Sequence, residues 1–231
     1  MSVWTGRRSE FRLVSPGEVI IRDSLYWIPL LCAHHGIRLD EAAQLRGRHI
    51  VKVSGILCFD LNSDPNLVLK NYNARRLIPV HQKMFDLGFD RLLEHLGADS
   101  LLFSELSNDN KNKSYGQSVN KRYGRYLKEL FEAEIAKTLT SHCFRHFVAT
   151  QLGNNPSFKD SWVNELMAHE GARVTEAERY NKQIYIANLK AMVDSIEVPI
   201  DYAKLRTLAD DAVSRQSARK VRAGGSRRTS R

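Results

Sequence analysis

The feature that most constrains the fold is a short block of strand-forming sequence, residues 49–81, set between long helical patterns. Three β-branched or aliphatic runs, "HIVKVSGILCFDL", "NLVLK" and "RRLIPVH", are interrupted by Gly55, "NSDPN" and "NYNA". Short runs bounded by turn residues predict three short antiparallel strands. The chain is therefore expected to be an α+β protein, mostly helical, with a small three-stranded antiparallel sheet near its N-terminal third.

Helical patterns occupy the rest of the chain. Residues 15–36 predict a helix with Ser15 as cap, Pro16 in the first turn and Gly36 at its end, and "RLDEAAQL" predicts a second. Further helical patterns lie at 82–96, 119–134, 140–153, 159–171 and 175–196, with a polar loop at 104–116. The last pattern carries an apolar stripe that predicts a core face, with exchange between subunits as the alternative: Ile186, Leu189, Met192, Val193 and Ile196.

The length and composition predict one main core. A chain of 231 residues with 42% hydrophobic content can bury one such core, which we place in residues 15–200. A lead-in of residues 1–14 precedes it, and a C-terminal helix over 201–214 and a basic disordered tail over 215–231 follow. The tail holds seven of the 35 basic residues, so 28 basic residues remain against 26 acidic ones elsewhere. It is interpreted either as a solubilising end or as an arm that follows phosphates.

Several classes of protein are disfavoured. The sequence has no apolar run of membrane-spanning length and its first residues are charged, so a cytoplasmic location without membrane binding is expected. Cys32, Cys58 and Cys143 are far apart among apolar neighbours, which favours reduced thiols over disulfides or a metal site. Neither a metal nor another cofactor is expected.

A series of charged and polar residues is spread along the chain in a defined order. His142 and Arg145 are three residues apart, but His35 and Arg38 share that spacing, so the pair alone identifies nothing. Arg38 has Glu41 three residues on, where a carboxylate can hold the guanidinium. The series continues with three more residues, namely Lys70, His169 and Tyr180.

The ordered texts "HGIRLDEAAQL", Lys70 before "ARRLIP", "HCFRHFVATQL", "MAH" and "RY" together resemble the catalytic domain of the tyrosine recombinases, the phage integrase family, over about residues 20–185. The usual "LGH" is "MAH" here, and the spacing from His169 to Tyr180 is slightly longer than common, which keeps Tyr185 as an alternative nucleophile. The family normally carries an N-terminal helical domain that clamps DNA. The chain begins almost at the catalytic domain, so we expect an excised fragment or a natural short version.

The resemblance implies a reaction and a set of residue roles. DNA strands would be cleaved and rejoined at specific sites through a 3′-phosphotyrosyl link, without metal or ATP. Arg38 and Arg145 would bind the non-bridging oxygens and His169 would add a hydrogen bond. Tyr180 would attack phosphorus and Lys70 would protonate the leaving oxygen. His142 would either accept the tyrosine proton or orient the phosphate.

Partners and alternatives follow from the same comparison. Double-stranded DNA is the expected partner, with self-association on DNA as a tetramer in the synaptic complex and a monomer in isolation. Charge suggests backbone contacts from four residues, namely Arg75, Arg76, Tyr123 and Arg125. A non-catalytic DNA-binding fragment or regulator is the alternative function, and a type IB topoisomerase is disfavoured. Taken singly, the site residues also fit structural roles: a surface ion pair, a turn-tip Lys, a helix-end His and a half-buried Tyr.

Overall fold

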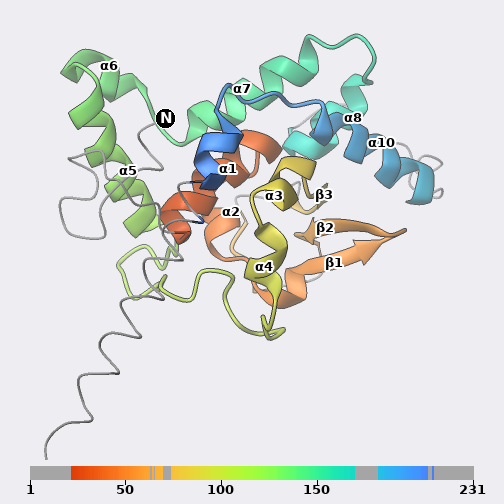
Figure 1. Ribbon diagram of the computed structural model, residues 1–231, viewed down its shortest axis with the longest axis horizontal. Helices are drawn as coiled ribbons and strands as arrows, with labels where there is room; N and C mark the ends of the chain where they lie inside the picture. The colour runs from red at the N-terminus through yellow and green to blue at the C-terminus, as the bar shows by residue number, and fades with distance from the viewer. Residues whose placement is uncertain are drawn as a thin grey trace, which may run out of the picture.

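The computed structural model describes residues 22–62, 64, 66–69, 74–169, 182–207 and 210, without the side chains of 182–184. Lys70 and Tyr180 lie outside the described residues, as do the expected lead-in over 1–14 and the expected tail over 215–231. The chain forms a mostly helical α+β structure (Figure 1), as the sequence predicts.

The sheet has three antiparallel strands in the order β1 (Ile50–Val53), β2 (Ile56–Asp60) and β3 (Leu77–Pro79). A two-residue turn joins β1 to β2, and both of its residues, Ser54 and Gly55, have positive φ, which suits a tight hairpin. The strand count is as predicted but the placement differs. "HIVKVSGILCFDL" forms two strands, and residues 66–69 of "NLVLK" form none, because the Gln44 side chain takes the backbone hydrogen bonds of Val68.

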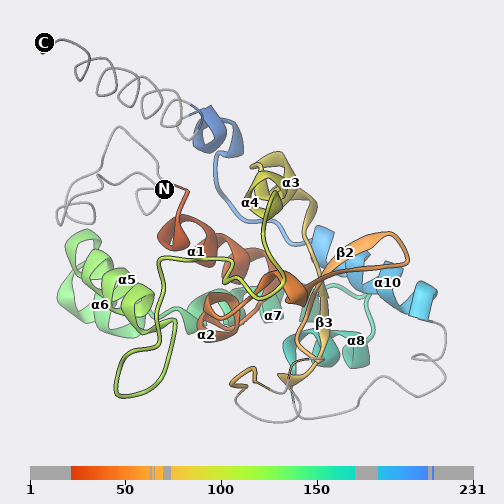
Figure 2. The ribbon, with the colours of Figure 1, turned by 90° about the horizontal axis from the view of Figure 1, so that it is seen from below.

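The helices surround a buried central helix, α1 (Ser24–His35), whose 12 residues are all buried. A helix that is apolar on every side belongs in a core. Other helices are α2 (Leu39–Ala43), the short 3₁₀ helix η2 (Gly47–His49), α3 (Gln82–Asp86), α4 (Phe89–Leu93), α5 (Gln117–Leu130), α6 (Ala133–Thr138), α7 (His142–Gly153), α8 (Asp160–Met167) and α10 (Lys182–Asp194). Residues 202–207 are also helical, within the C-terminal helix predicted over 201–214. Helix α1 contacts α2, α5 and α7, while α10 packs on β2 and β3. The sheet and the α5–α6 pair lie on opposite sides of α1 (Figures 1 and 2).

Several helices are shorter than their sequence patterns predict. The first begins at Ser24, because Asp23 caps it by accepting a hydrogen bond from the Leu25 amide. The pattern over 82–96 divides at Gly88, whose φ of 83° is left-handed. The pattern over 119–134 divides between α5 and α6, and α8 ends at left-handed Ala168 rather than at Gly171.

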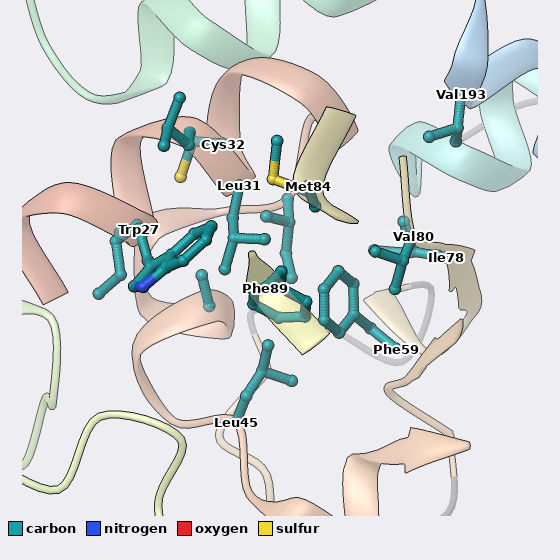
Figure 3. Close-up of a cluster of buried hydrophobic side chains, with 14 of the residues drawn as sticks. Trp27, Leu31, Cys32, Leu45, Phe59, Ile78, Val80, Met84, Phe89 and Val193 are labelled. Carbon is teal, nitrogen blue, oxygen red and sulfur yellow. The ribbon is translucent and has the colours of Figure 1, made fainter. Parts of the chain in front are cut away.

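The main core joins α1 to the sheet. Trp27 of α1, Phe59 of β2 and Phe89 of α4 point toward one another (Figure 3), with ring centroids 5.2 Å apart for Trp27 and Phe89 and 6.0 Å apart for Phe59 and Phe89. Edge-on aromatic packing of this kind favours one arrangement of the elements. The stripe predicted on α10 is buried in this same core, with Leu189, Met192 and Val193 at 0% exposure. None of the described helices is long and apolar enough to span a membrane.

Three buried histidines connect α1, the end of the sheet and the segment after α10. His34, His35 and His81 each donate one ring N–H to a backbone carbonyl and accept a hydrogen bond with the other ring nitrogen. The carbonyls belong to Leu30, Leu31 and Ile196, and the donors are the Tyr202 hydroxyl and the His81 and Lys83 amides. This pattern requires neutral rings at His35 and His81, because protonation would turn a second N–H toward a backbone amide, and burial favours the neutral ring at His34 by lowering its pKa.

Acid is expected to destabilise the protein through this cluster. Burial lowers the pKa of His34 to about 3 and holds the pKa of His35 and His81 below the ordinary value. Unfolded imidazoles bind protons below about pH 6.5, so stability is complete above that pH and falls as the pH decreases. The three groups should cost about 3–4 kcal/mol of unfolding free energy between pH 7.5 and 5.5.

Urea unfolding at the two pH values measures this slope. His35→Gln should reduce it by about a third, because one of three linked groups is removed. The matched control is His95→Gln, since His95 is exposed on the surface. An unchanged slope in His35→Gln would contradict the assignment.

Candidate active site

Arg38 is held at the N-terminus of α2 by Glu41. It is the extended residue before the helix, and its Nη1 donates to Glu41 Oε1 at 2.7 Å while its amide donates to Glu41 Oε2 at 3.0 Å. The charge-assisted bond from Nη1 fixes the direction of the guanidinium, and the bond from the amide fixes the Glu41 carboxylate that receives it. The side chain remains 20% exposed, so one edge of Arg38 is left for a ligand.

Arg76 is an interior residue, which corrects its expected role as a contact to the DNA backbone. It is 1% exposed, and its Nη2 donates to Glu41 Oε2 at 2.9 Å. Its Nε donates to the Leu166 carbonyl of α8 at 2.8 Å and its Nη1 to the Ala74 carbonyl at 2.6 Å. The guanidinium therefore supports Glu41 from behind and links α2, the approach to β3 and the end of α8.

Arg145 reaches the same region from α7. It is 4% exposed, and its Nη1 donates to the Gly36 carbonyl at 2.8 Å. The helices meet closely here, because a Cβ at Gly36 (φ 62°) would lie 2.7 Å from Met167 Sδ and 3.2 Å from Val148 Cγ1. Arg145 Nη2 is buried and has no hydrogen-bond partner among the described residues. A buried unpaired donor of this kind is costly unless a ligand accepts from it.

The electrostatic balance at this point is positive. Burial, and next the charges of Arg38 and Arg76, lower the pKa of Arg145. Glu41 carries the opposing charge, and despite its burial the two neighbouring guanidiniums keep its pKa low. Three guanidinium groups therefore face one carboxylate, and an anion would relieve their mutual repulsion.

A cavity of about 570 Å³ joins Arg38, Glu41 and Arg145. Its walls come from α2, from residues 68–69, from the segment 112–117 and from the start of α7. Arg38, Glu41, His142 and Arg145 line it together, although more than 100 residues separate the two pairs in sequence. The fold thus brings four of the sequence-predicted site residues to one opening.

The two histidines of the predicted site lie at helix ends. His142 is the first residue of α7, lines the cavity and packs its ring edge-on against His146 at 4.7 Å between centroids. His169 follows Ala168 at the end of α8, and its amide donates to the Asn164 carbonyl at 3.0 Å. Burial, then the charges of Arg145 and Arg38, lower the pKa of His169. A neutral His169 at pH 7 can still donate one hydrogen bond to an oxygen.

The remaining predicted residues lie away from the cavity or outside the described residues. Arg75 donates from Nη1 to the Asn62 carbonyl at 2.7 Å, and Arg125 is exposed on α5. Tyr123 is half-buried beside Phe144, with ring centroids 5.7 Å apart. Lys70 and Tyr180 are not described.

Some cavity residues were not predicted from the sequence. Asp40 accepts hydrogen bonds from the Ser114 hydroxyl at 2.5 Å and the Gly116 amide at 3.1 Å, which holds the polar segment against α2. This contact brings Lys113 to the cavity wall, and Gln44 lines the wall beside α2. The lysines of "NKNKSYG" were the available signal, but Asp40, which holds this segment through Ser114 and Gly116, is more than 70 residues away in the sequence.

Paired guanidiniums at a cavity, on a mostly helical α+β fold, are an arrangement that suits an anionic ligand. The sequence profile described as the Phage integrase family matches residues 20–186, and the chain belongs to this family. The family carries out site-specific DNA recombination in general, and its members act on DNA. No curated protein and no solved structure matches the chain at a significant level.

Removing the Glu41 carboxylate is expected to be strongly destabilising. Glu41→Ala leaves the buried Arg76 guanidinium without its counter-charge, which should cost about 3–5 kcal/mol in the free energy of unfolding. Chemical denaturation measures this change in the free energy of unfolding. The matched control is Glu134→Ala, which breaks the exposed pair with Lys137 and should cost less than about 1 kcal/mol.

A double variant separates charge from packing. The double variant that combines Glu41→Leu with Arg76→Met removes both buried charges. It should therefore be less destabilised than Glu41→Ala. Equal destabilisation by Glu41→Ala and Glu134→Ala would show that the buried pair does not hold the site together.

Proposed function

We propose that the chain is a tyrosine-type site-specific recombinase that cleaves and rejoins DNA through a 3′-phosphotyrosyl intermediate. The observation that carries this proposal is the shared cavity of Arg38 and Arg145, where Arg145 Nη2 has no partner among the described residues. A phosphodiester supplies the acceptor that this donor lacks.

The two arginines perform the electrostatic part of the reaction. Charge shifts onto the non-bridging oxygens as a nucleophile approaches phosphorus, and fixed guanidinium donors stabilise that charge without reorganising. Glu41 holds Arg38 and the Gly36 carbonyl holds Arg145, so both donors are positioned before DNA binds. His169 adds a hydrogen bond from a neutral ring.

The covalent step follows from the residue types. The Tyr180 hydroxyl attacks phosphorus, the bond from phosphorus to O5′ breaks, and its electron pair goes to O5′. Lys70 donates a proton to O5′, and the phenolic proton passes to His142 or to water. The phosphodiester energy is kept in the phosphotyrosyl bond, so the reverse step needs no ATP or metal. Exchange between two duplexes involves four strands, which favours four copies on paired sites.

A nicked suicide duplex tests the proposal. Cleavage near the nick releases a short strand, so rejoining is prevented and the covalent protein–DNA adduct accumulates. Trypsin then separates the two candidate nucleophiles, because Arg179, Lys182 and Lys190 place Tyr180 and Tyr185 on different peptides. We expect the nucleotide on the peptide Tyr180–Lys182.

The other outcomes each have a defined meaning. A nucleotide on the peptide 183–190 would assign Tyr185 as the nucleophile, although that side chain packs against the hydrophobic core. Specific DNA binding without any adduct would support a non-catalytic DNA-binding regulator instead. A chain that neither binds nor cleaves DNA would contradict both.

A further inference from the structure

The Gln44 side chain forms a two-bond clamp on the backbone of Val68. Its Nε2 donates to the Val68 carbonyl at 3.0 Å, and its Oε1 accepts from the Val68 amide at 2.9 Å. The amide thus acts as one rung of a β-ladder, although residues 66–69 are not a strand. Gln44 is 6% exposed and directly follows α2, the helix that presents Arg38.

The clamp holds the backbone at a residue that packing does not hold. Leu67 and Leu69 pack against the core, whereas Val68 is 74% exposed. Earlier in the segment, Asp64 Oδ2 accepts from His49 Nε2 at 3.0 Å and from Arg48 Nε at 2.9 Å. Gln44 is therefore the last polar anchor in the described chain before Lys70.

Chain geometry gives this anchor a consequence for the reaction. Val68 lines the cavity together with Arg38 and Arg145, and Lys70 is two residues further along. Two residues span at most about 7 Å, so fixing Val68 limits where the Lys70 backbone can lie. Catalytic groups lose much of their effect when displaced by about 1 Å.

We propose that Gln44 is a positioning residue that acts through Lys70, by tying the chain before the general acid to the helix that carries Arg38. This inference rests on the proposed function and deepens it. When the bond from phosphorus to O5′ breaks, the electron pair left on O5′ takes its proton from the Lys70 ammonium, which becomes an amine. Loss of the clamp leaves the arginine site intact and makes that proton transfer slower.

The test compares two leaving groups on the same nicked suicide duplex. One duplex has the natural O5′ at the scissile phosphate, and the other has sulfur in its place. An alkyl thiol has a pKa near 8.5, far below that of an alcohol, so it departs as a thiolate without a proton. General acid catalysis contributes about 10²–10⁴-fold, and Gln44→Leu should lose part of it, slowing cleavage of the oxygen duplex about 10–100-fold. Cleavage of the sulfur duplex should change by less than about 3-fold.

The chain contains a matched control for the loss of such a clamp. Gln151 makes the same pair of bonds to Glu197, donating to its carbonyl at 2.9 Å and accepting from its amide at 3.1 Å. Gln151→Leu should leave both cleavage rates unchanged. Gln44→Glu keeps the acceptor and loses the donor, so it should fall between the natural protein and Gln44→Leu on the oxygen duplex, and it serves if Gln44→Leu does not fold.

The outcomes separate this inference from the proposed function. Equal slowing of both duplexes by the Gln44 variants would show a general structural role and overturn the inference, as would no slowing of either. Lys70→Ala, tested in parallel, should slow only the oxygen duplex, and equal slowing would overturn the acid role of Lys70 and the inference with it. If the natural protein forms no adduct on the oxygen duplex and none on the sulfur duplex, the proposed function is overturned instead.

Discussion

Tyr180→Phe is expected to abolish the covalent DNA adduct, lowering its rate of formation by at least about three orders of magnitude. The substitution removes only the hydroxyl, so the atom that would bond to phosphorus is lost while the ring is kept. The adduct is measured by denaturing gel electrophoresis on the nicked duplex. Binding of the same duplex, measured by gel mobility shift, should be unchanged because the phosphate donors remain in place.

Tyr185→Phe is the matched control for that substitution. Tyr185 is five residues further on, at the start of α10, and it packs against the hydrophobic core. The adduct should therefore persist in Tyr185→Phe at a rate close to that of the natural protein. Persistence of the adduct in Tyr180→Phe, together with its loss in Tyr185→Phe, would reverse the assignment.

Arg145→Ala is expected to slow cleavage by about 10³-fold at saturating DNA. Removing one preorganised donor to a developing oxyanion costs about 10²–10³-fold, and Arg145 also supplies a buried full charge. Arg145→Lys keeps the charge but loses the planar fork, one nitrogen of which donates to the Gly36 carbonyl while the other would, under the proposed function, donate to a phosphate oxygen. It should therefore retain only part of the activity, about 10-fold above Arg145→Ala. Single-turnover rates on the nicked duplex measure both variants.

The control for Arg145 is an arginine that faces solvent. Arg125→Ala on α5 removes an exposed cation, so it should weaken DNA binding, most strongly at low salt, while leaving the single-turnover rate at saturation unchanged. Melting temperatures of the Arg145 variants separate a loss of rate from a loss of folding. Full activity in Arg145→Ala would contradict its place at the reacting phosphate.

Local patterns predicted which helices and strands form better than they predicted the residues at which those elements begin and end. The apolar stripe on α10 was readable because residues three and four apart share one helix face, and its residues are in the core. Breaks within helices were missed where a single residue has left-handed backbone, as at Gly88 and Ala168. The strand predicted at "NLVLK" was wrong because a side chain from another element, Gln44, takes the hydrogen bonds of Val68.

The candidate site divides in the same way. The pairing of Arg38 with Glu41 could be predicted because the two residues are three apart, although they meet as the residue before α2 and the third residue of that helix rather than on one helical face. The buried position of Arg76 could not be predicted, since "ARRLIP" contains two neighbouring arginines of equal chemistry. Arg75 bonds to a nearby carbonyl, whereas Arg76 turns inward to Glu41 and to Leu166, 35 and 90 residues away.

The sequence by itself determined the class of fold, the family and the order of the charged residues along the chain, because periodicity and spacing are properties of neighbouring residues. Only the tertiary structure decided which of those residues share a cavity and which are buried supports. The physical reason is that burial and charge depend on contacts between segments far apart in the chain. The Arg145 guanidinium is held by the carbonyl of Gly36, 109 residues away, and that contact exists only once α1 and α7 have packed.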